Sequence, residues 1–157
     1  MRERVKWCFG LRDGLKMVDP SERLARAYLW EAVSSLKRAE KNLADGDLLW
    51  TSVVAYYADY YALYAFLQRI GVKCENHACS ILAATCLLGK GQTSVIQEHK
   101  DRRIDAQYHM RLGREAEVRN MLAEAKVFVA VFSRIVEDTS EEDVAAYRKQ
   151  LVAMGRG

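Results

Sequence analysis

The longest apolar stretch in the chain lies between Asp47 and Gly71, and it predicts the central helix of the fold. It contains no proline and no internal glycine, and almost every position from Leu48 to Leu67 is apolar, aromatic or small. At about 3.6 residues per turn, one face consists of Leu49, Val53, Tyr57, Tyr60, Tyr64 and Leu67, flanked by Trp50, Val54, Tyr61 and Ala65. A helix that is apolar nearly all round has to be buried on more than one side. Asp47 suits the N-cap position of this helix.

A stretch of about 20 apolar residues can also span a membrane. This stretch, however, carries five tyrosines together with Thr51, Ser52 and Asp59. Their polar groups would all need hydrogen-bond partners in lipid. The pattern therefore favours a helix inside a helical bundle, and we expect no membrane partner.

An amphipathic pattern predicts a helix before the central one, over residues 22–44. Its apolar positions lie among arginine, lysine and glutamate residues; they are Leu24, Tyr28, Val33, Leu36 and Leu43. Asp19 suits the N-cap, Pro20 the first helical position and Glu22 the third position of a capping box.

Three further helices are predicted downstream. Asn76 suits the N-cap of a short apolar helix over residues 77–88, and Thr93 or Ser94 opens a polar helix that runs to about Met110. Residues 114–137 then form a strongly amphipathic helix. Its apolar stripe consists of Val118, Met121, Leu122, Ala125, Phe128, Val129, Phe132 and Ile135.

The remaining segments are shorter and lie at the two ends of the chain. Residues 1–18 favour a short helix with an imperfect apolar edge at Val5, Cys8, Phe9 and Leu11. The segment Thr139–Glu142 caps a last helix over residues 141–154, whose apolar face is Val144, Tyr147 and Leu151.

These patterns predict an all-α fold, an up-and-down bundle of about five main helices. The chain of 157 residues is expected to form one domain. Its core lies in residues 22–137, and residues 1–18 and 139–157 are terminal additions. One proline and nine glycines leave little room for a β-rich fold, and no segment predicts a strand or an internal repeat.

Composition narrows the function classes only slightly. The net charge of +3 permits nucleic-acid binding without requiring it. The first residues contain no long apolar segment of the kind found in secretory signals, so a cytoplasmic location is expected.

The cysteines are predicted to be free thiols, because disulfides are rare in cytosolic proteins. There are four of them: Cys8, Cys74, Cys79 and Cys86. The last three surround His77, but their spacing fits no zinc pattern, since paired C-x2-C sets are missing. Cys79 and Cys86 also fall at helical core spacing, where buried thiols are common. We therefore expect no metal and no other cofactor.

The most basic stretch of the chain is residues 99–114, HKDRRIDAQYHMRLGR. It contains Lys100, Arg102, Arg103, Arg111 and Arg114 together with His99, His109, Asp101 and Asp105. One interpretation is a solvated helix face. The other is a phosphate site, with arginine as a planar donor and histidine titrating near neutral pH.

Three features of the central region need partners or roles. Asp59 is predicted to be buried, and a buried carboxylate needs a partner, for which we expect a cationic side chain from residues 99–114. His77 is interpreted as a helix-start histidine with satisfied polar partners, the alternative being a base or ligand near a cleft. Tyr57, Tyr60 and Tyr61 are interpreted as core or dimer interface, although tyrosines can also stack on nucleobases.

The segment YYADYYALYAFLQRIGVKCENHACSI, residues 56–81, resembles the second-helix signature of small prokaryotic HEPN domains. In that family a helix rich in tyrosine and alanine is followed by a glycine, a short loop and a histidine that opens the next helix. Residues 103–109, RIDAQYH, fall where the family carries its arginine-containing helix motif. The resemblance covers roughly residues 22–137.

The resemblance implies an RNA-binding helical bundle, often a homodimer, that is a ribonuclease toxin paired with a minimal nucleotidyltransferase antitoxin. Arg103 would hold the scissile phosphate and His109 would act as general base or acid, without a metal ion, giving a 2′,3′-cyclic phosphate and a 5′-hydroxyl. Arg102, Tyr108, Asp105 and Lys100 are the further candidates for contacts to RNA.

Two departures from the family pattern bear on catalysis. Five residues separate Arg103 from His109, where four are commonest, and the apolar Ile104 follows the arginine. On a continuous helix such a pair differs by about 120° and about 9 Å. A working site therefore needs groups from two subunits or a bend in the helix near His109.

Three hypotheses stay open from the sequence. The first is a HEPN-type ribonuclease. The second is a non-catalytic HEPN adaptor that binds a nucleotide or a nucleotidyltransferase partner through the same face. The third is a bundle that only binds other proteins.

Overall fold

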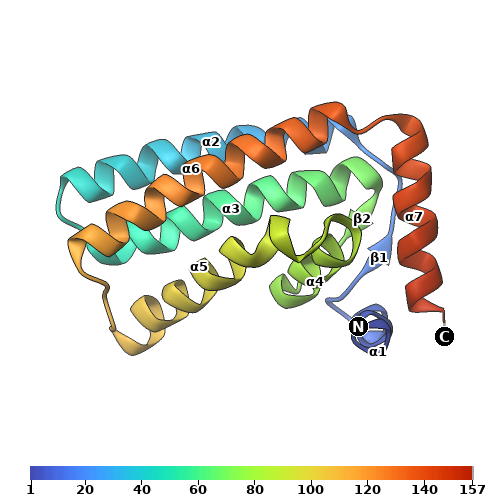
Figure 1. Ribbon diagram of the computed structural model, residues 1–157, viewed down its shortest axis with the longest axis horizontal. Helices are drawn as coiled ribbons and strands as arrows, with labels where there is room; N and C mark the ends of the chain where they lie inside the picture. The colour runs from blue at the N-terminus through green and yellow to red at the C-terminus, as the bar shows by residue number, and fades with distance from the viewer. Residues whose placement is uncertain (157) are drawn as a thin grey trace.

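The helix predicted after Asp47 is α3, Leu48–Ile70, and it forms the centre of the computed structural model, which describes residues 1–156 (Figure 1). The Asp47 carboxylate accepts a hydrogen bond from the backbone N–H of Trp50 at 3.0 Å, as an N-cap should. From Thr51 onward nearly every residue of α3 is buried. The expectation that this helix is covered on more than one side is confirmed.

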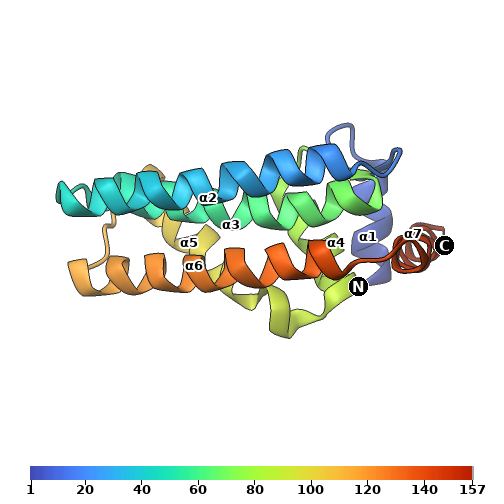
Figure 2. The same cartoon turned by 90° about the horizontal axis from the view of Figure 1, so that it is seen from above.

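α3 is one of four long helices that alternate in direction. α2 (Glu22–Ala44) and α5 (Lys90–His109) run one way, while α3 and α6 (Glu115–Asp138) run the other way (Figures 1 and 2). α3 contacts each of the other three helices. The predicted all-α, up-and-down bundle is confirmed.

Three shorter helices close one end of the bundle. α4 (His77–Leu88) links α3 to α5, and α7 (Glu141–Gly155) crosses the end of the bundle beside α1 (Arg2–Gly10) (Figure 1). The Arg148 side chain of α7 donates hydrogen bonds to the backbone carbonyls of Val18, Ile70 and Gly71. It therefore caps the C-terminal end of α3 and fastens α7 to it.

A two-stranded antiparallel sheet, which the sequence patterns did not predict, lies at the same end. β1 (Lys16–Met17) pairs with β2 (Val72–Lys73). Gly71, with φ of 77°, turns the chain from α3 into β2. A Cβ atom at this position would lie 2.4 Å from the Val18 carbonyl oxygen, so both the left-handed backbone and the close packing require glycine.

The helix interfaces are built differently on the two sides of α3. On α6, seven of the eight predicted stripe residues are buried and Ile135 is half-buried. On α2 the predicted stripe is wrong at Val33, which is exposed. The buried residues of α2 are mainly small, namely Ala25, Ala32, Ser35, Ala39 and Leu43. Small side chains let the two helix backbones approach closely, and the larger side chains lie at the edges.

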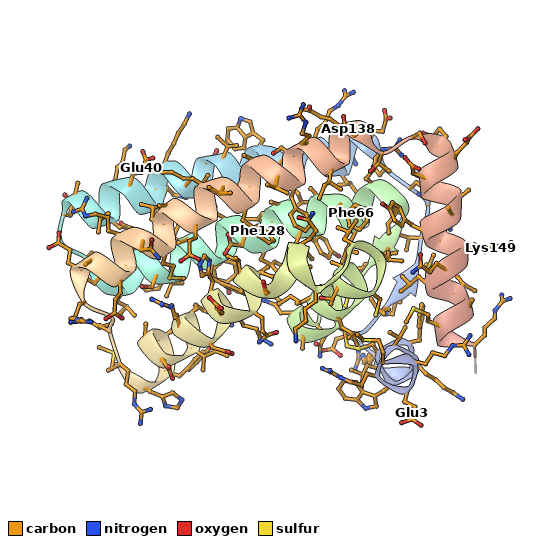
Figure 3. The ribbon with its side chains drawn as sticks, viewed as in Figure 1. Glu3, Glu40, Phe66, Phe128, Asp138 and Lys149 are labelled. Atoms are coloured by element: carbon orange, nitrogen blue, oxygen red, sulfur yellow. A yellow bond between two sulfur atoms is a disulfide. The ribbon has the colours of Figure 1, made fainter. Side chains whose placement is uncertain are left out.

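Figure 3 shows the resulting separation of apolar and charged side chains. Phe66 of α3 and Phe128 of α6 lie in the interior, whereas Glu3, Glu40 and Lys149 lie at the periphery. None of the helices in residues 1–156 combines the length and the apolarity that a membrane crossing needs.

Two helix starts differ from the sequence predictions. α2 is capped by Ser21, whose Oγ accepts from the N–H of Leu24, rather than by Asp19. The segment before Ser21 is held extended along α3, since the N–H of Val18 donates to the carbonyl of Gly71. α5 starts directly after Gly89, and Thr93 is buried in contact with Thr85 instead of serving as a cap. The predicted cap at Asn76 is confirmed, and within the predicted capping segment Thr139–Glu142 the N-cap is Ser140.

The prediction of four free thiols is wrong, because Cys8 of α1 and Cys79 of α4 form a disulfide. Cys74 and Cys86 are free. The two bonded cysteines are 71 residues apart, and only the packing of α1 against α4 brings them together, so no local spacing signalled the pair. Across the part of the chain that the structure describes, no group of three His, Cys, Asp or Glu side chains is placed to hold a metal ion.

The disulfide should contribute strongly to stability. It closes a loop with a sequence separation of 71 residues, and a closed loop of this length corresponds to roughly 4 kcal/mol of lost chain entropy in the unfolded state. We expect Cys8→Ser to lower the free energy of unfolding by about that amount. Urea unfolding of the wild type with and without dithiothreitol measures the same quantity.

Cys86→Ser is the matched control, since Cys86 is a free, half-buried thiol. It should leave the difference between the oxidised and the reduced protein unchanged. An identical unfolding midpoint for the wild type in both conditions contradicts the prediction.

Candidate functional site

Arg103 of α5 lies against the tyrosines of α3. Its guanidinium carbon is 4.9 Å from the ring centroid of Tyr56, 5.8 Å from that of Tyr57 and 6.0 Å from that of Tyr108. One guanidinium N–H donates to the side-chain oxygen of Gln107 at 3.3 Å. The Nε atom is buried and has no hydrogen-bond partner in residues 1–156. Arg103 is thus positioned by aromatic rings and keeps donors unused.

His77, the first residue of α4, packs on the same tyrosines. Its ring stacks on Tyr60 with the centroids 3.8 Å apart and the planes at 13°. Its Nδ1 atom is 2.9 Å from the hydroxyl oxygen of Tyr56. The hydroxyl of Tyr60 in turn pairs with Ser80 of α4 at 3.1 Å. These contacts fix the imidazole between α3 and α4.

The charges around His77 are all positive. Burial, together with the positive charges of Arg103 and Lys100, lowers the pKa of His77 to about 4. Burial also lowers the pKa of Lys100, with Asp101 opposing, and it raises the pKa of the Tyr56 hydroxyl. At neutral pH the site therefore contains two cations, a neutral imidazole and a neutral phenol.

No carboxylate neutralises the two cations directly. Neither Arg103 nor Lys100 forms an ion pair with any side chain of the described residues. Partly buried cations without counter-ions favour the binding of an anion.

Asp59 has a partner from residues 99–114, the segment that the sequence predicted, and this partner is His99. The Nδ1 atom of His99 lies 2.5 Å from Oδ2 of Asp59, and both side chains are fully buried. Burial raises the pKa of Asp59 to about 6, against the lowering effect of His99. The Nε2 atom of His99 faces the carboxylate of Glu124 on α6 at 3.9 Å, too far for a hydrogen bond. This group joins α3, α5 and α6.

Arg102 and Asp105 lie on another side of α5. They line a cavity of about 260 Å³ between α5 and the start of α6, together with Ser52, Arg111 and Glu117. Successive helical residues point about 100° apart, which explains why Arg102 and Arg103 belong to different surfaces. The predicted RNA contacts are therefore divided, with Lys100 in the Arg103 group and Arg102 and Asp105 in the cavity.

His109 is the last residue of α5, and its side chain is exposed. α5 is continuous from Lys90 to His109, so Arg103 and His109 differ by about 120° around the helix and about 9 Å along it. One chain therefore does not place the two residues on a common face. Tyr108 is also largely exposed, at 67%.

The other tyrosines of α3 are divided between core and surface. Tyr60 is buried, while Tyr57 and Tyr61 are half-buried. The Tyr61 ring lies 6.1 Å from that of Tyr57 and 6.0 Å from that of Tyr28 on α2. A row of three partly exposed rings thus extends from the Arg103 group across α3 to α2.

Sequence reasoning missed the residue that joins the site, Tyr56. It contacts both His77 and Arg103, yet it did not stand out among five tyrosines. Its spacing from Tyr60, four residues, places the two on one helix face and could have marked them as a pair. That this face meets both α4 and α5 follows only from the tertiary fold.

Compared with known proteins, the chain matches no family model, no curated protein and no solved structure. The resemblance to HEPN domains accordingly depends on residues 56–81 and 103–109 and on the order of the helices that carry them.

The Asp59–His99 pair generates a prediction about stability. His99→Ala leaves the Asp59 carboxylate buried without its partner, which costs about 3 kcal/mol or more in the free energy of unfolding at pH 7.5. The pKa of Asp59 in the folded protein, about 6, lies above the ordinary value of 3.8. A carboxyl of this kind stabilises the fold when protonated, and that contribution is lost as the pH rises through the folded-state pKa.

His99 lowers the pKa of Asp59. In the His99→Ala variant the pKa of Asp59 is therefore higher still, and the variant loses stability over a wider pH range. The loss relative to the wild type should therefore be larger at pH 7.5 than at pH 4.5, as measured by urea unfolding. His109→Ala, at an exposed position of the same helix, should change stability by less than about 0.5 kcal/mol. A loss that is greater at pH 4.5 contradicts this account.

Proposed function

We propose that this protein binds RNA through the face that carries Arg103 and Lys100, and that it is a metal-independent ribonuclease of the HEPN type. The observation that carries the proposal is the guanidinium of Arg103, which is held against Tyr56 and Tyr57 without an ion pair and whose solvent-accessible Nη2 atom forms no hydrogen bond within residues 1–156. The planar fork of arginine matches the oxygens of a phosphate group. Lys100, without an ion pair, adds a second positive charge.

The proposed reaction is a transesterification at phosphorus. A general base takes the proton of the 2′-hydroxyl, whose oxygen attacks the phosphorus atom. The bond from phosphorus to the 5′-oxygen breaks, and that oxygen receives a proton from a general acid. Arg103 stabilises the charge that develops on the phosphate oxygens. The products are a 2′,3′-cyclic phosphate and a 5′-hydroxyl.

His109 is the proposed acid–base residue, and the geometry of α5 determines how it can act. Since Arg103 and His109 of one chain do not share a face, we propose that the site is shared by two subunits of a homodimer. Tyr108 and Lys100 would contact the phosphates nearest the site. Arg102 and Asp105, at the neighbouring cavity, would contact RNA farther along the strand.

The cellular role that we propose is that of a cytoplasmic toxin held by a minimal nucleotidyltransferase antitoxin. The support is the resemblance of residues 56–81 and 103–109 to HEPN domains. Large apolar side chains left exposed on α2 and α6 support association with another chain. These are Trp30, Val33, Val127 and Val131.

A non-catalytic adaptor is the second candidate. The separation of His109 from Arg103 within one chain favours it, because an adaptor needs the cationic face but not the histidine. Such a protein would bind a nucleotide or a nucleotidyltransferase partner through Arg103 and Lys100 and would cut nothing.

The test is incubation of the pure protein with a mixed RNA pool in EDTA, with the ends of the products mapped. The wild type should produce cyclic phosphate ends. Arg103→Ala and His109→Ala should each lower the rate by about 100-fold or more. Arg134→Ala, at an exposed arginine of α6, is the matched control and should cut like the wild type.

Mixing the two inactive variants tests the shared site. If Arg103 and His109 come from different subunits, half of the mixed population consists of heterodimers with one intact site, and about a quarter of the activity returns. Cutting that survives in both single variants contradicts the assignment. No cutting by a folded dimer, with RNA binding that Arg103→Ala abolishes, identifies the adaptor.

A further inference from the structure

We propose that Arg103, Lys100 and His77 of a single chain together hold one phosphate group, with the Nε2–H group of His77 as a hydrogen-bond donor. This inference deepens the proposed function and rests on it for the source of the phosphate, a nucleotide of RNA. It assigns to His77 a role that neither the sequence motif nor the proposed reaction gives it.

His77 and Arg103 border the same two rings, those of Tyr56 and Tyr57. His77 pairs with the Tyr56 hydroxyl at 2.9 Å and lies 6.0 Å from the centroid of Tyr57. The guanidinium carbon of Arg103 lies 4.9 Å and 5.8 Å from the centroids of these rings. Lys100 precedes Arg103 by three residues, so both point to the same side of α5.

The hydrogen bond to Tyr56 determines which nitrogen of His77 carries the hydrogen. The Tyr56 side chain is fully buried, and its hydroxyl has Nδ1 of His77 as its partner. A buried phenol O–H needs an acceptor, so the hydroxyl donates and Nδ1 accepts. A neutral imidazole with an accepting Nδ1 has its hydrogen on Nε2. The imidazole is neutral at pH 7, since its pKa is lowered to about 4.

The Nε2 atom is available to a ligand. It forms no hydrogen bond within residues 1–156, and it is not among the buried polar atoms that lack a partner. It is therefore reached by solvent. His77 thus presents an N–H donor whose direction is fixed by Tyr56 on one side and by stacking on Tyr60 on the other.

Arg103 also has an unused donor. Its Nη2 atom forms no hydrogen bond within residues 1–156 and is not among the buried polar atoms that lack a partner, so solvent reaches it. A phosphate oxygen between Arg103 and His77 would accept from it. Asp101, next to Lys100, raises the pKa of the lysine by its negative charge. Its carboxylate forms no ion pair with Lys100 and instead accepts a hydrogen bond from the side-chain amide of Gln97 at 3.4 Å.

The position of His77 in α4 adds to the attraction. It is the first residue of a twelve-residue helix whose N-cap is Asn76. The positive end of the helix dipole therefore lies at the same place as the two cations. Together these groups form a cluster of donors that suits a phosphate and repels a cation.

The experiment is an NMR titration of the histidine side chains with pH, with and without inorganic phosphate. A bound anion favours the charged imidazole, so the titration midpoint of His77 should rise by at least about one pH unit, a tenfold change in its proton affinity. A His77 midpoint that stays unchanged at phosphate concentrations that saturate the protein overturns the proposal.

Variants locate the phosphate. Arg103→Gln and Lys100→Gln should each weaken phosphate binding by about tenfold, as measured by the same shift, whereas Arg134→Gln at an exposed position of α6 should not. Tyr56→Phe removes the O–H group that fixes the imidazole and should also weaken binding. Equal binding by the wild type and by Arg103→Gln overturns the site, and so does equal binding by Tyr56→Phe.

Two 2′-deoxy trinucleotides, one with a 5′-phosphate and one without, distinguish a terminal phosphate from an internal phosphodiester as the bound group. Both lack the attacking 2′-hydroxyl and are therefore not cut. A shift with the 5′-phosphorylated oligonucleotide alone identifies a terminal phosphate, and a shift with both identifies the internal diester. Failure of this proposal is distinct from failure of the proposed function. If RNA cutting requires Arg103 and His109 but phosphate leaves the titration midpoint of His77 unchanged, only the present inference is overturned.

Discussion

The burial of α3 is the constraint on which the rest of the structure depends. A helix covered on nearly every side cannot leave its polar side chains to water, so each needs a partner from a neighbouring element. Asp59 takes His99 from α5, Tyr56 and Tyr60 take His77 and Ser80 from α4, and Arg69 takes the carbonyl of Thr139 before α7. The polar residues of the central helix therefore determine where the other helices lie, and the apolar ones supply the energy that holds them there.

The candidate site is a consequence of this arrangement. α5 runs antiparallel to α3, and the bond between His99 and Asp59 sets the register of the two helices. Four residues later along α5, Arg103 reaches Tyr56, which precedes Asp59 by three residues on α3. The buried pair thus positions a guanidinium over the tyrosines one turn away. A change at His99 would disturb the site without touching any group that is proposed to meet RNA.

The sequence predicted the features that depend on neighbouring residues, and it missed those that depend on distant ones. Helix periods, the caps at Asp47 and Asn76, and the capping segment Thr139–Glu142 could be predicted because they involve residues three or four apart. Asp59 could be assigned a partner from residues 99–114 because burial demands one. The disulfide between Cys8 and Cys79 could not, since it joins helices that only the tertiary fold brings together. For the same reason Arg103 and Lys100 were predicted as site residues, while their association with His77 through Tyr56 was not.

The protonation pattern of the site separates binding from reaction. Within one chain, the groups around Arg103 are cations or donors, because Nδ1 of His77 is engaged by Tyr56 and Nε2 carries the hydrogen. Such a site holds a phosphate but has no base to accept the proton of a 2′-hydroxyl. On the proposed function that base is His109 of a second chain. A monomer would then bind RNA and leave it intact, and cutting would appear only as the protein dimerises. The same cationic face therefore serves an adaptor or a ribonuclease, and the supply of one histidine from a second subunit decides between them.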